Sequence, residues 1–218
     1  MRKLRVYALL SIVFFCLLFL HLWVDEARGT ARIYRPNADG DALNWDGVYP
    51  TSPTTHYDKV DDAGVGDGDA TYVYKGTFPP NGIPIELYHV TDPGAGELND
   101  STINYVRVYS RMRCVGGTTG GTEYVYINGW SSSYWGDPGH TYSGDCDEFS
   151  YVQYYTQWNV NPETGVAWTK SDITNLQIGT GKTNGNYTLR DTQVYLYVDF
   201  SPPSTGKNSN LLKRQQRK

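Results

Sequence analysis

Five aspartates in one short, glycine-rich stretch are the residues best suited to holding a metal ion. They are Asp58, Asp61, Asp62, Asp67 and Asp69. Calcium takes about six to eight oxygen ligands, which the carboxylates and backbone carbonyls of a flexible loop can supply together. The spacing is not that of an EF-hand, because no D-x-D-x-D-G is followed by a glutamate. A structural calcium site and a solvated turn between two strands are both open interpretations.

Aromatic side chains are concentrated in the glycine- and serine-rich loop 129–145, and they are candidates for binding a sugar. The segment contains Trp130, Tyr134, Trp135, His140 and Tyr142. Aromatic rings offer broad apolar faces and the neighbouring polar groups offer hydrogen bonds, a combination that suits a carbohydrate ligand. Alternatively, these rings pack over the open end of a β-sandwich and bind no ligand.

Residues arranged for catalysis are scarce. The chain has no G-x-S-x-G, H-E-x-x-H or C-x-x-C motif. Its histidines are His21, His56, His89 and His140. Acid pairs such as Glu86 and Glu123 would suit a glycoside hydrolase, but any acidic β-sandwich offers such pairs. The sequence therefore predicts a protein that is not an enzyme.

The N-terminal segment predicts export. Arg2, Lys3 and Arg5 precede an apolar run of 17 residues, Ala8 to Val24. A basic region before such a run is typical of a signal peptide or a signal anchor, and the run is just long enough to span a bilayer. We expect residues 1–29 to form one of the two, with a transmembrane helix at about 8–24. Cleavage and retention are both open, so the remaining protein is expected at the cell surface, membrane-anchored, or secreted.

Two cysteines, Cys114 and Cys146, follow this segment. Disulfides persist in oxidising compartments, so a bridge between the two is expected in an exported protein. Two buried thiols are the alternative.

Charged residues are unevenly distributed along the chain. The formal net charge is −4, but residues 30–206 hold 21 acidic and 10 basic side chains. Nucleic-acid binding requires a basic surface, so this acidic body argues against nucleic acid as a partner. Residues 202–218 are basic and have no strand pattern, and we expect them to form a disordered tail.

Runs rich in β-branched and aromatic residues recur between clusters of turn residues. They cover residues 31–36, 54–60, 70–76, 83–90, 102–115, 122–130, 148–158, 176–180 and 191–200. Many short strands at this spacing are typical of a β-sandwich or jelly roll. The sequence therefore predicts an all-β protein, with a jelly-roll-like antiparallel β-sandwich over residues 30–201.

Alternation within these runs predicts which side chains face the core. The core side is expected to hold Val106, Val108, Ser110, Met112, Cys114, Val125, Ile127, Val194, Leu196, Val198 and Phe200. The opposite side is expected to hold Tyr105, Arg107, Tyr109, Arg111, Arg113, Tyr124, Tyr126, Tyr195 and Tyr197. Such a tyrosine- and arginine-rich face is a second candidate site, for a partner or for a neighbouring copy. Tyrosine is also simply a good strand former.

One segment, residues 161–179 (NPETGVAWTKSDITNLQIG), carries a helix start instead of a strand pattern. Thr169 is a favourable N-cap, and Asp172 lies three residues later, as in a capping box. Trp168 and Ile173 take the two positions of a hydrophobic staple, and Leu176 follows one turn later. We expect a short helix near residues 169–175, with Trp168 packed against the core; a ligand platform is the alternative role for Trp168.

The pattern N-P-x-T-G-x-A-W-T-x-x-D-I-x-x-L-Q-x-G in this segment is accompanied by RPNADGDALNW at 35–45 and HYDKVDDAGVGDGDATYVY at 56–74. Together they resemble a β-sandwich module that recurs in uncharacterised phage, prophage and metagenomic surface proteins, including tail-fibre-like ones. The resemblance covers about residues 32–200. It implies a jelly-roll-like sandwich related in shape to lectins and carbohydrate-binding modules, and it implies no catalytic residues. The N-terminal apolar segment departs from a virion fibre, which needs no anchor.

These features predict a non-enzymatic, exported β-sandwich that acts in surface recognition or adhesion, with a glycan or surface polymer as ligand. The alternative is a structural subunit of a surface filament or virion, in which the exposed face mediates self-association. A hydrolase acting on polysaccharide ranks behind both.

Overall fold

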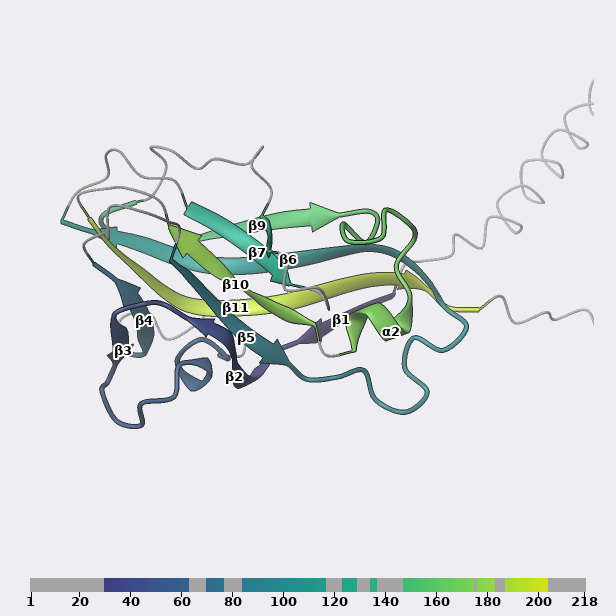
Figure 1. The fold of residues 1–218 in the computed structure, drawn as a ribbon, viewed down its shortest axis with the longest axis horizontal. Helices are drawn as coiled ribbons and strands as arrows, with labels where there is room; N and C mark the ends of the chain where they lie inside the picture. Colours follow the sequence, from purple (N-terminus) through teal and green to yellow (C-terminus); the bar gives the residue numbers. More distant parts are fainter. Residues whose placement is uncertain are drawn as a thin grey trace, which may run out of the picture.

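Two antiparallel sheets pack face to face as a β-sandwich in the computed structural model (Figure 1). The structure describes residues 30–62, 70–76, 84–116, 123–128, 134–136, 147–174, 176–182 and 187–203. This part is mostly strand with few helical residues, which confirms the predicted antiparallel sandwich. The finer assignment to a jelly roll stays a prediction. The N-terminal hydrophobic helix predicted within residues 1–29 and most of the basic tail lie outside the described residues.

No helix among the described residues is both long and apolar enough to cross a membrane. Within the described ranges the helical elements are a 3₁₀-helix, η1 (Tyr57–Lys59), and a short α-helix, α2 (Lys170–Ile173). Figure 1 shows α2 at the end of the sandwich opposite β3 and β4.

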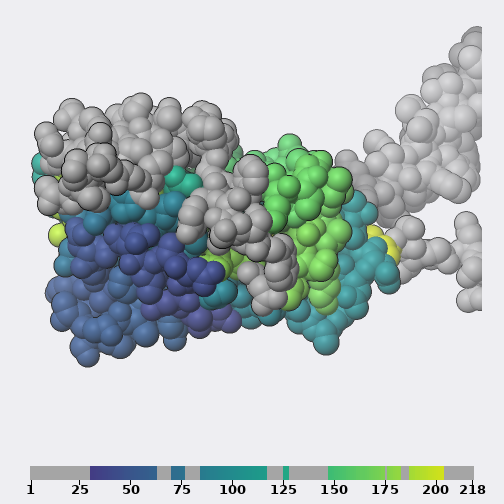
Figure 2. Space-filling view, in the orientation of Figure 1, coloured from purple at the N-terminus to yellow at the C-terminus, as the bar shows by residue number. Residues whose placement is uncertain are grey.

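Sheet A contains the longest strands of the sandwich. Its order is β3 (Gly47–Tyr49), β4 (Tyr72–Lys75), β11 (Thr188–Ser201), β6 (Thr102–Val115) and β9 (Val152–Trp158), and β1 (Thr30–Tyr34) also pairs with β11. Sheet B has the order β2 (Pro36–Leu43), β5 (Ile85–Val90), β10 (Gln177–Lys182), β7 (Glu123–Asn128) and β8 (Tyr134–Gly136). The chain passes from one sheet to the other at most steps, so neighbouring strands are far apart in sequence. Figure 2 shows the result on the surface, where blue N-terminal residues and green residues from later in the chain share one face.

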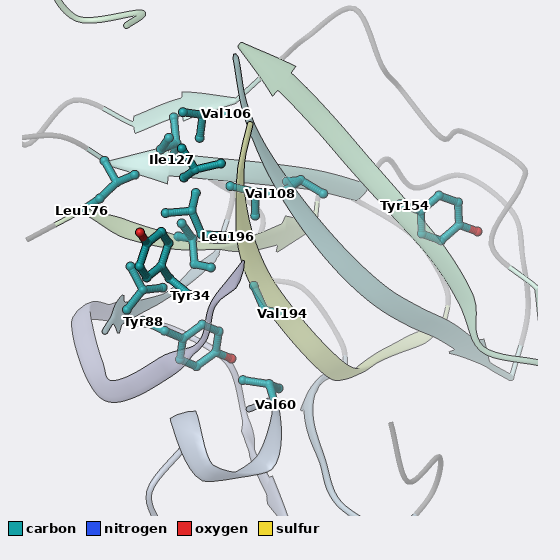
Figure 3. Close-up of a cluster of buried hydrophobic side chains, with 14 of the residues drawn as sticks. Tyr34, Val60, Tyr88, Val106, Val108, Ile127, Tyr154, Leu176, Val194 and Leu196 are labelled. Carbon is teal, nitrogen blue, oxygen red and sulfur yellow. The ribbon is translucent and has the colours of Figure 1, made fainter. Parts of the chain in front are cut away.

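The core lies between the sheets and is aliphatic on the side of β6 and β11. Figure 3 shows Val106, Val108 and Leu196 from sheet A close to Ile127 and Leu176. Every β6 and β11 residue that alternation placed on the core side is buried, including Ser110. The alternation prediction is therefore confirmed for both strands, because the buried sides of the sandwich exclude water from one side of each strand.

The outer side of sheet B differs from the prediction. Tyr126 does point away from Val125 and Ile127, but it is buried in a second small cluster with Ala42, Ile85 and Leu87. Tyr126 therefore belongs to an apolar contact rather than to an exposed tyrosine face. Among the described side chains, the predicted tyrosine–arginine surface belongs to sheet A.

Several predicted strand assignments are wrong. Residues 54–60 were expected to form a strand but contain η1, because the Asp39 carboxylate accepts hydrogen bonds from the backbone N–H of His56 and of Tyr57, at 2.9 and 2.8 Å. The strands β2 and β3 fall in stretches rich in turn-forming residues and were not predicted. The short strand β8 lies within 129–145, which was expected to be a loop, and pairs with β7.

The helix start in 161–179 is confirmed as predicted. Thr169 caps α2, its backbone N–H donates to Asp172 at 2.7 Å, and Asp172 N–H donates back to the Thr169 hydroxyl at 3.3 Å. Trp168 is 5% exposed, and its Nε1 donates to the carbonyl of Trp158 at 3.0 Å. Ile173 and Leu176 are buried in the same core cluster. Trp168 is therefore a structural brace between α2 and β9, not an exposed ligand platform.

Candidate functional site

Among the described residues, the outer side of sheet A is the surface on which tyrosine and arginine side chains collect. We call it the tyrosine–arginine face. It comprises Arg35, Tyr105, Arg107, Tyr109, Arg111, Arg113, Tyr151, Gln153, Tyr155, Gln157, Arg190, Tyr195 and Tyr197. Alternation leaves these side chains on the water side, because their neighbours along each strand fill the core.

Stacked tyrosines occupy the centre of this face. Tyr109 on β6 lies opposite Tyr195 on β11 and opposite Tyr155 on β9. The centroid of the Tyr109 ring is 4.8 Å from that of Tyr195 at an interplanar angle of 13°, and 5.2 Å from that of Tyr155. Tyr105 and Tyr197 form another stacked pair at 6.1 Å. Each such contact contributes about 0.5–1.5 kcal/mol beyond the buried area, so the row is held in a defined arrangement.

Planar polar side chains hold the tyrosines together. The Nε of Arg107 donates to the side-chain oxygen of Gln157 at 2.7 Å, and its Nη1 donates to the Tyr109 hydroxyl at 3.2 Å. The same guanidinium lies over the rings of Tyr105 and Tyr155, at 4.6 and 4.8 Å from their centroids. The face therefore presents cationic and hydrogen-bonding groups directly beside aromatic rings.

Two properties make the tyrosine centre suited to binding. Tyr155 lies on β9, which pairs only with β6 among the described strands, and its side chain is 45% exposed. The Tyr195 hydroxyl accepts from Gln153 at 2.5 Å, and burial raises its pKa further above neutral. Exposed ring surface beside hydroxyl, amide and guanidinium groups can meet both the apolar and the hydroxyl sides of a sugar.

The aromatic residues predicted to bind a sugar are mostly outside the described residues. Trp130, His140 and Tyr142 fall there. Tyr134 and Trp135 belong to β8, where the backbone alone is described, in register with Asn128 and Ile127. They lie on a strand and not on the expected loop, because this stretch adds to the edge of sheet B beside β7. A role for the five residues in ligand binding stays a prediction.

Only some of the aspartates predicted to bind calcium lie among the described residues. Asp58 forms an ion pair with Lys59 at 3.6 Å, while the backbone carbonyls of Asp61 and Asp62 accept from Nη1 of Arg35. Asp67 and Asp69 lie outside the described residues. In the ranges that the structure describes, no three His, Cys, Asp or Glu side chains are grouped so that they could hold a metal ion. Calcium binding therefore stays a prediction.

Cys114 forms a disulfide, and Cys146 lies outside the described residues. The backbone N–H of Cys114 donates to the carbonyl of Asp147 at 3.0 Å. The residue that follows Cys146 is thus held beside Cys114, which supports the predicted pairing of the two cysteines.

Polar contacts, most of them half-buried, join the segments that carry the resemblance to the surface module to the rest of the sandwich. Asp39 binds the start of η1, whose His56 Nδ1 contacts the Glu86 carboxylate, and Glu86 also accepts from the backbone N–H of Trp45 at 3.1 Å. Burial raises the pKa of Glu86, which is fully buried, and the hydrogen bond to Glu86 raises the pKa of His56. Such a buried carboxylate cannot reach a polysaccharide, so Glu86 serves the fold and not catalysis.

A second set of polar contacts joins β2 to β10. Gln177 accepts from the backbone N–H of Asp41 at 2.8 Å and donates to its carboxylate at 2.7 Å. These residues come from the first and last of the resembling segments. The resemblance therefore identifies residues that close the sandwich, while the tyrosine–arginine face was indicated only by alternation.

Alternation indicated the part of the face on β6 and β11. It did not indicate Arg35, Tyr151, Gln153, Tyr155, Gln157 or Arg190. Tyr151, Gln153, Tyr155 and Gln157 alternate with the buried Tyr154 and Thr156, so the same period-two pattern in the run 148–158 could have identified them. Arg190 lies on β11 just before the predicted run 191–200.

Comparisons with known proteins give no family. No family model matches the chain, and no curated protein matches it. Solved structures that resemble it include a xylan-binding module, CBM15, with a TM-score of 0.38 and 10% identity over 81% of this chain and 99% of that one. A chain of broad bean stain virus has a TM-score of 0.25 and 10% identity over 66% of this chain and 88% of that one. A chain of infectious bursal disease virus, Gt strain, has a TM-score of 0.30 and 7% identity over 82% of this chain and 39% of that one. Similarity this low carries no argument about ligand or activity.

Proposed function

We propose that this protein is a non-enzymatic glycan-binding β-sandwich and that the tyrosine–arginine face of sheet A is its binding surface. The observation that carries the proposal is the row Tyr195–Tyr109–Tyr155, flanked by Arg107 and Gln157. A glycan ring would pack on exposed ring surface at Tyr155, and its hydroxyls would meet the amide and guanidinium groups.

We further propose that the protein works outside the cytoplasm, at the cell surface or secreted. The basic and apolar N-terminal sequence supports this location. The disulfide at Cys114 supports it independently, because structural disulfides are rare in reducing compartments.

A glycan array with the full-length protein tests the function. The protein should be kept in a polyoxyethylene detergent, which carries no sugar headgroup that would compete. We expect binding to polysaccharide ligands, weakened about tenfold in Tyr155→Ala, which corresponds to about 1.4 kcal/mol. Phe149→Ala is the matched control, because Phe149 is an 88% exposed aromatic residue just before β9 that is not part of the row.

Variants in the second predicted site separate the two surfaces. Trp130→Ala and Trp135→Ala should leave binding intact if the tyrosine–arginine face is the site. Loss of binding in these variants, with Tyr155→Ala unaffected, would move the site to segment 129–145. No binding to any glycan would remove the proposed function itself.

Self-association is the second candidate function, and a specific observation favours it. Phe149, Val160 and Val166 are exposed apolar side chains, at 88, 46 and 61%, before and after the edge strand β9. Exposed apolar groups beside a strand that has a single partner among the described strands favour contact with another copy. Light scattering over a concentration series tests this: growth of the particle mass that Phe149→Ala suppresses would support a structural subunit, and a constant monomer mass would exclude it.

A further inference from the structure

A cleft lies beside β1, next to the tyrosine–arginine face. Its volume is about 510 Å³, which falls within the range of pockets that bind small ligands. Residues 32–35 of β1 form one wall, and Thr91, Asp92, Gly94 and Glu97 from the segment after β5 form the other. We call it the β1 cleft.

Two contacts between these walls bound the β1 cleft. At one end the backbone N–H of Thr91 donates to the carbonyl of Arg35 at 3.0 Å. At the other end Nε of Arg32 lies 3.3 Å from Oε1 of Glu97. A space that is bounded at both ends favours a small ligand, or one terminal ring of a larger ligand, over an extended chain that would have to run through it.

Charged hydrogen-bonding groups in the β1 cleft are accessible to solvent. The side chains of Arg32 and Glu97 are 51 and 35% exposed. Arg32 uses one of its five N–H donors on Glu97, and among the described residues its guanidinium has no other partner. The Glu97 carboxylate is oriented by the backbone N–H of Gly94 at 3.0 Å and by the Tyr34 hydroxyl at 3.4 Å. A donor fork beside a carboxylate can bind two neighbouring hydroxyls of a sugar, one as acceptor and one as donor.

Ile33 adds apolar surface and joins the β1 cleft to the tyrosine–arginine face. It is 50% exposed and lies opposite Tyr197 in the register of β1 with β11. Arg35, from the same wall, lies over the ring of Tyr195 at 5.6 Å from its centroid. The path from Tyr155 on β9 through β6 and β11 to β1 crosses three strand spacings, or roughly 14 Å. One glycan can therefore contact both the tyrosine row and the cleft.

The wall opposite β1 is ordered by contacts within the protein. Leu98, next to Glu97, is buried in the core cluster. The backbone N–H of Glu97 donates to the carbonyl of Gly94 at 3.0 Å, and Gly96 takes a φ of 88°, a conformation that glycine adopts readily. A wall that is already ordered loses little conformational freedom when a ligand binds.

We propose that the β1 cleft is a second subsite for the glycan and binds one uncharged sugar ring at the end of a chain or branch. The hydroxyls of the ring bind Arg32 and Glu97, and its apolar side packs on Ile33. The charges of Arg32 and Glu97 compensate each other, so an ionised sugar gains no advantage there. This inference rests on the proposed glycan-binding function and adds the position at which a terminal ring is recognised.

Titration with single sugars tests the β1 cleft directly. The full-length protein, isotope-labelled for NMR and kept in polyoxyethylene detergent, is titrated with the methyl glycosides of glucose, galactose, mannose, xylose and N-acetylglucosamine. We expect at least one of them to shift the backbone amide resonances of Ile33, Gly94 and Glu97 saturably. Saturation should require millimolar sugar, because one ring makes few contacts.

Substitutions in and beside the cleft test which groups bind the sugar. Glu97→Gln should weaken binding at least about fivefold, because it removes a charged acceptor and nearly keeps the side-chain shape. Asp100→Asn is the matched control and should leave binding unchanged, since it removes an acidic charge from the same loop at an exposed residue outside the cleft. Ile33→Ala should weaken binding and preserve the fold, because Ile33 is half exposed.

The glycan array connects the β1 cleft to the tyrosine row. Glu97→Gln and Tyr155→Ala should each weaken binding of the same oligosaccharides, those long enough to cover roughly three strand spacings. If Tyr155→Ala weakens array binding while none of the five methyl glycosides shifts an amide of the cleft, the inference is wrong and the glycan-binding function stands.

The remaining outcomes also decide the matter. Equal losses in Glu97→Gln and Asp100→Asn would overturn the inference, because the effect would then come from overall charge. Tighter binding of methyl glucuronide than of methyl glucoside would contradict an uncharged ligand. A trialanine peptide that shifts the cleft amides more strongly than any glycoside would replace the ligand class. No binding to any glycan would remove both the inference and the proposed function.

Discussion

The two sides of sheet A are built from the same strands but differ in the kind of side chain they present. On β11, Leu196 is fully buried among aliphatic neighbours, while the adjacent Tyr197 lies on the opposite side, stacked on Tyr105. On β6, Val108 lies on the inner side and the adjacent Arg107 lies on the outer side. The inner side maximises burial and is uniform in character. The outer side combines stacked tyrosines with arginines, and Tyr155 near its centre is 45% exposed. We infer that the inner side makes the fold and the outer side makes the binding surface.

The largest effect is expected from a pair of adjacent substitutions on β11. Leu196→Ala should lower the free energy of unfolding by about 3 kcal/mol, because it leaves a cavity in a closely packed core. Tyr197→Ala should lower it by less than about 1.5 kcal/mol, because it removes only a surface aromatic contact. Urea denaturation of both variants measures the difference. Equal losses of stability would mean that the outer row is as essential to the fold as the core.

An intermediate effect is expected from pH, which acts on the inner side through Asp191. This carboxyl is fully buried beside the Ser110 hydroxyl, which donates to it at 2.9 Å, and burial raises its pKa from 3.8 to about 7. The folded protein thus holds this proton more tightly than the unfolded chain. Stability from this group is complete below pH 3.8 and is lost as the pH rises through 7. His56, whose pKa is also raised, acts in the same direction.

We therefore expect the free energy of unfolding to fall by about 2 kcal/mol between pH 5 and pH 8. Denaturant titrations at several pH values measure this slope. Asp191→Asn carries no titrating proton and should flatten it, leaving the contributions of His56 and Glu86, whose pKa values are also raised. A stability that increases from pH 5 to pH 8 in the native sequence would contradict the assignment.

The smallest effect is expected from an element that belongs to neither side of the sheet. Thr169→Ala removes the N-cap of α2 and should cost about 1 kcal/mol. Glycan affinity should stay unchanged, because α2 lies apart from the tyrosine–arginine face. Differential scanning calorimetry and the glycan array report the two quantities separately, and a loss of affinity would show that α2 is coupled to the site.

Features that depend on near neighbours were predictable. The boundaries of β6 agree with the predicted run 102–115, because fourteen residues alternate without interruption. The capping box at Thr169 and Asp172 was also predictable, since both partners lie within one turn. Where a distant residue intervened, prediction failed. Residues 54–60 have strand-like composition, yet the carboxylate of Asp39, 17 residues earlier, captures two backbone N–H groups and forms η1 instead.

The sequence by itself determined which side chains of β6 and β11 face outward, since alternation is a property of each strand. Only the tertiary structure decided that Tyr109 lies between Tyr195 and Tyr155, and that Arg113 faces Arg190. Those neighbours come from strands that are distant in the chain, and their contact depends on sheet order and register. Local patterns therefore specified which side chains lie on the surface, and the pairing of remote strands gathered them onto one face.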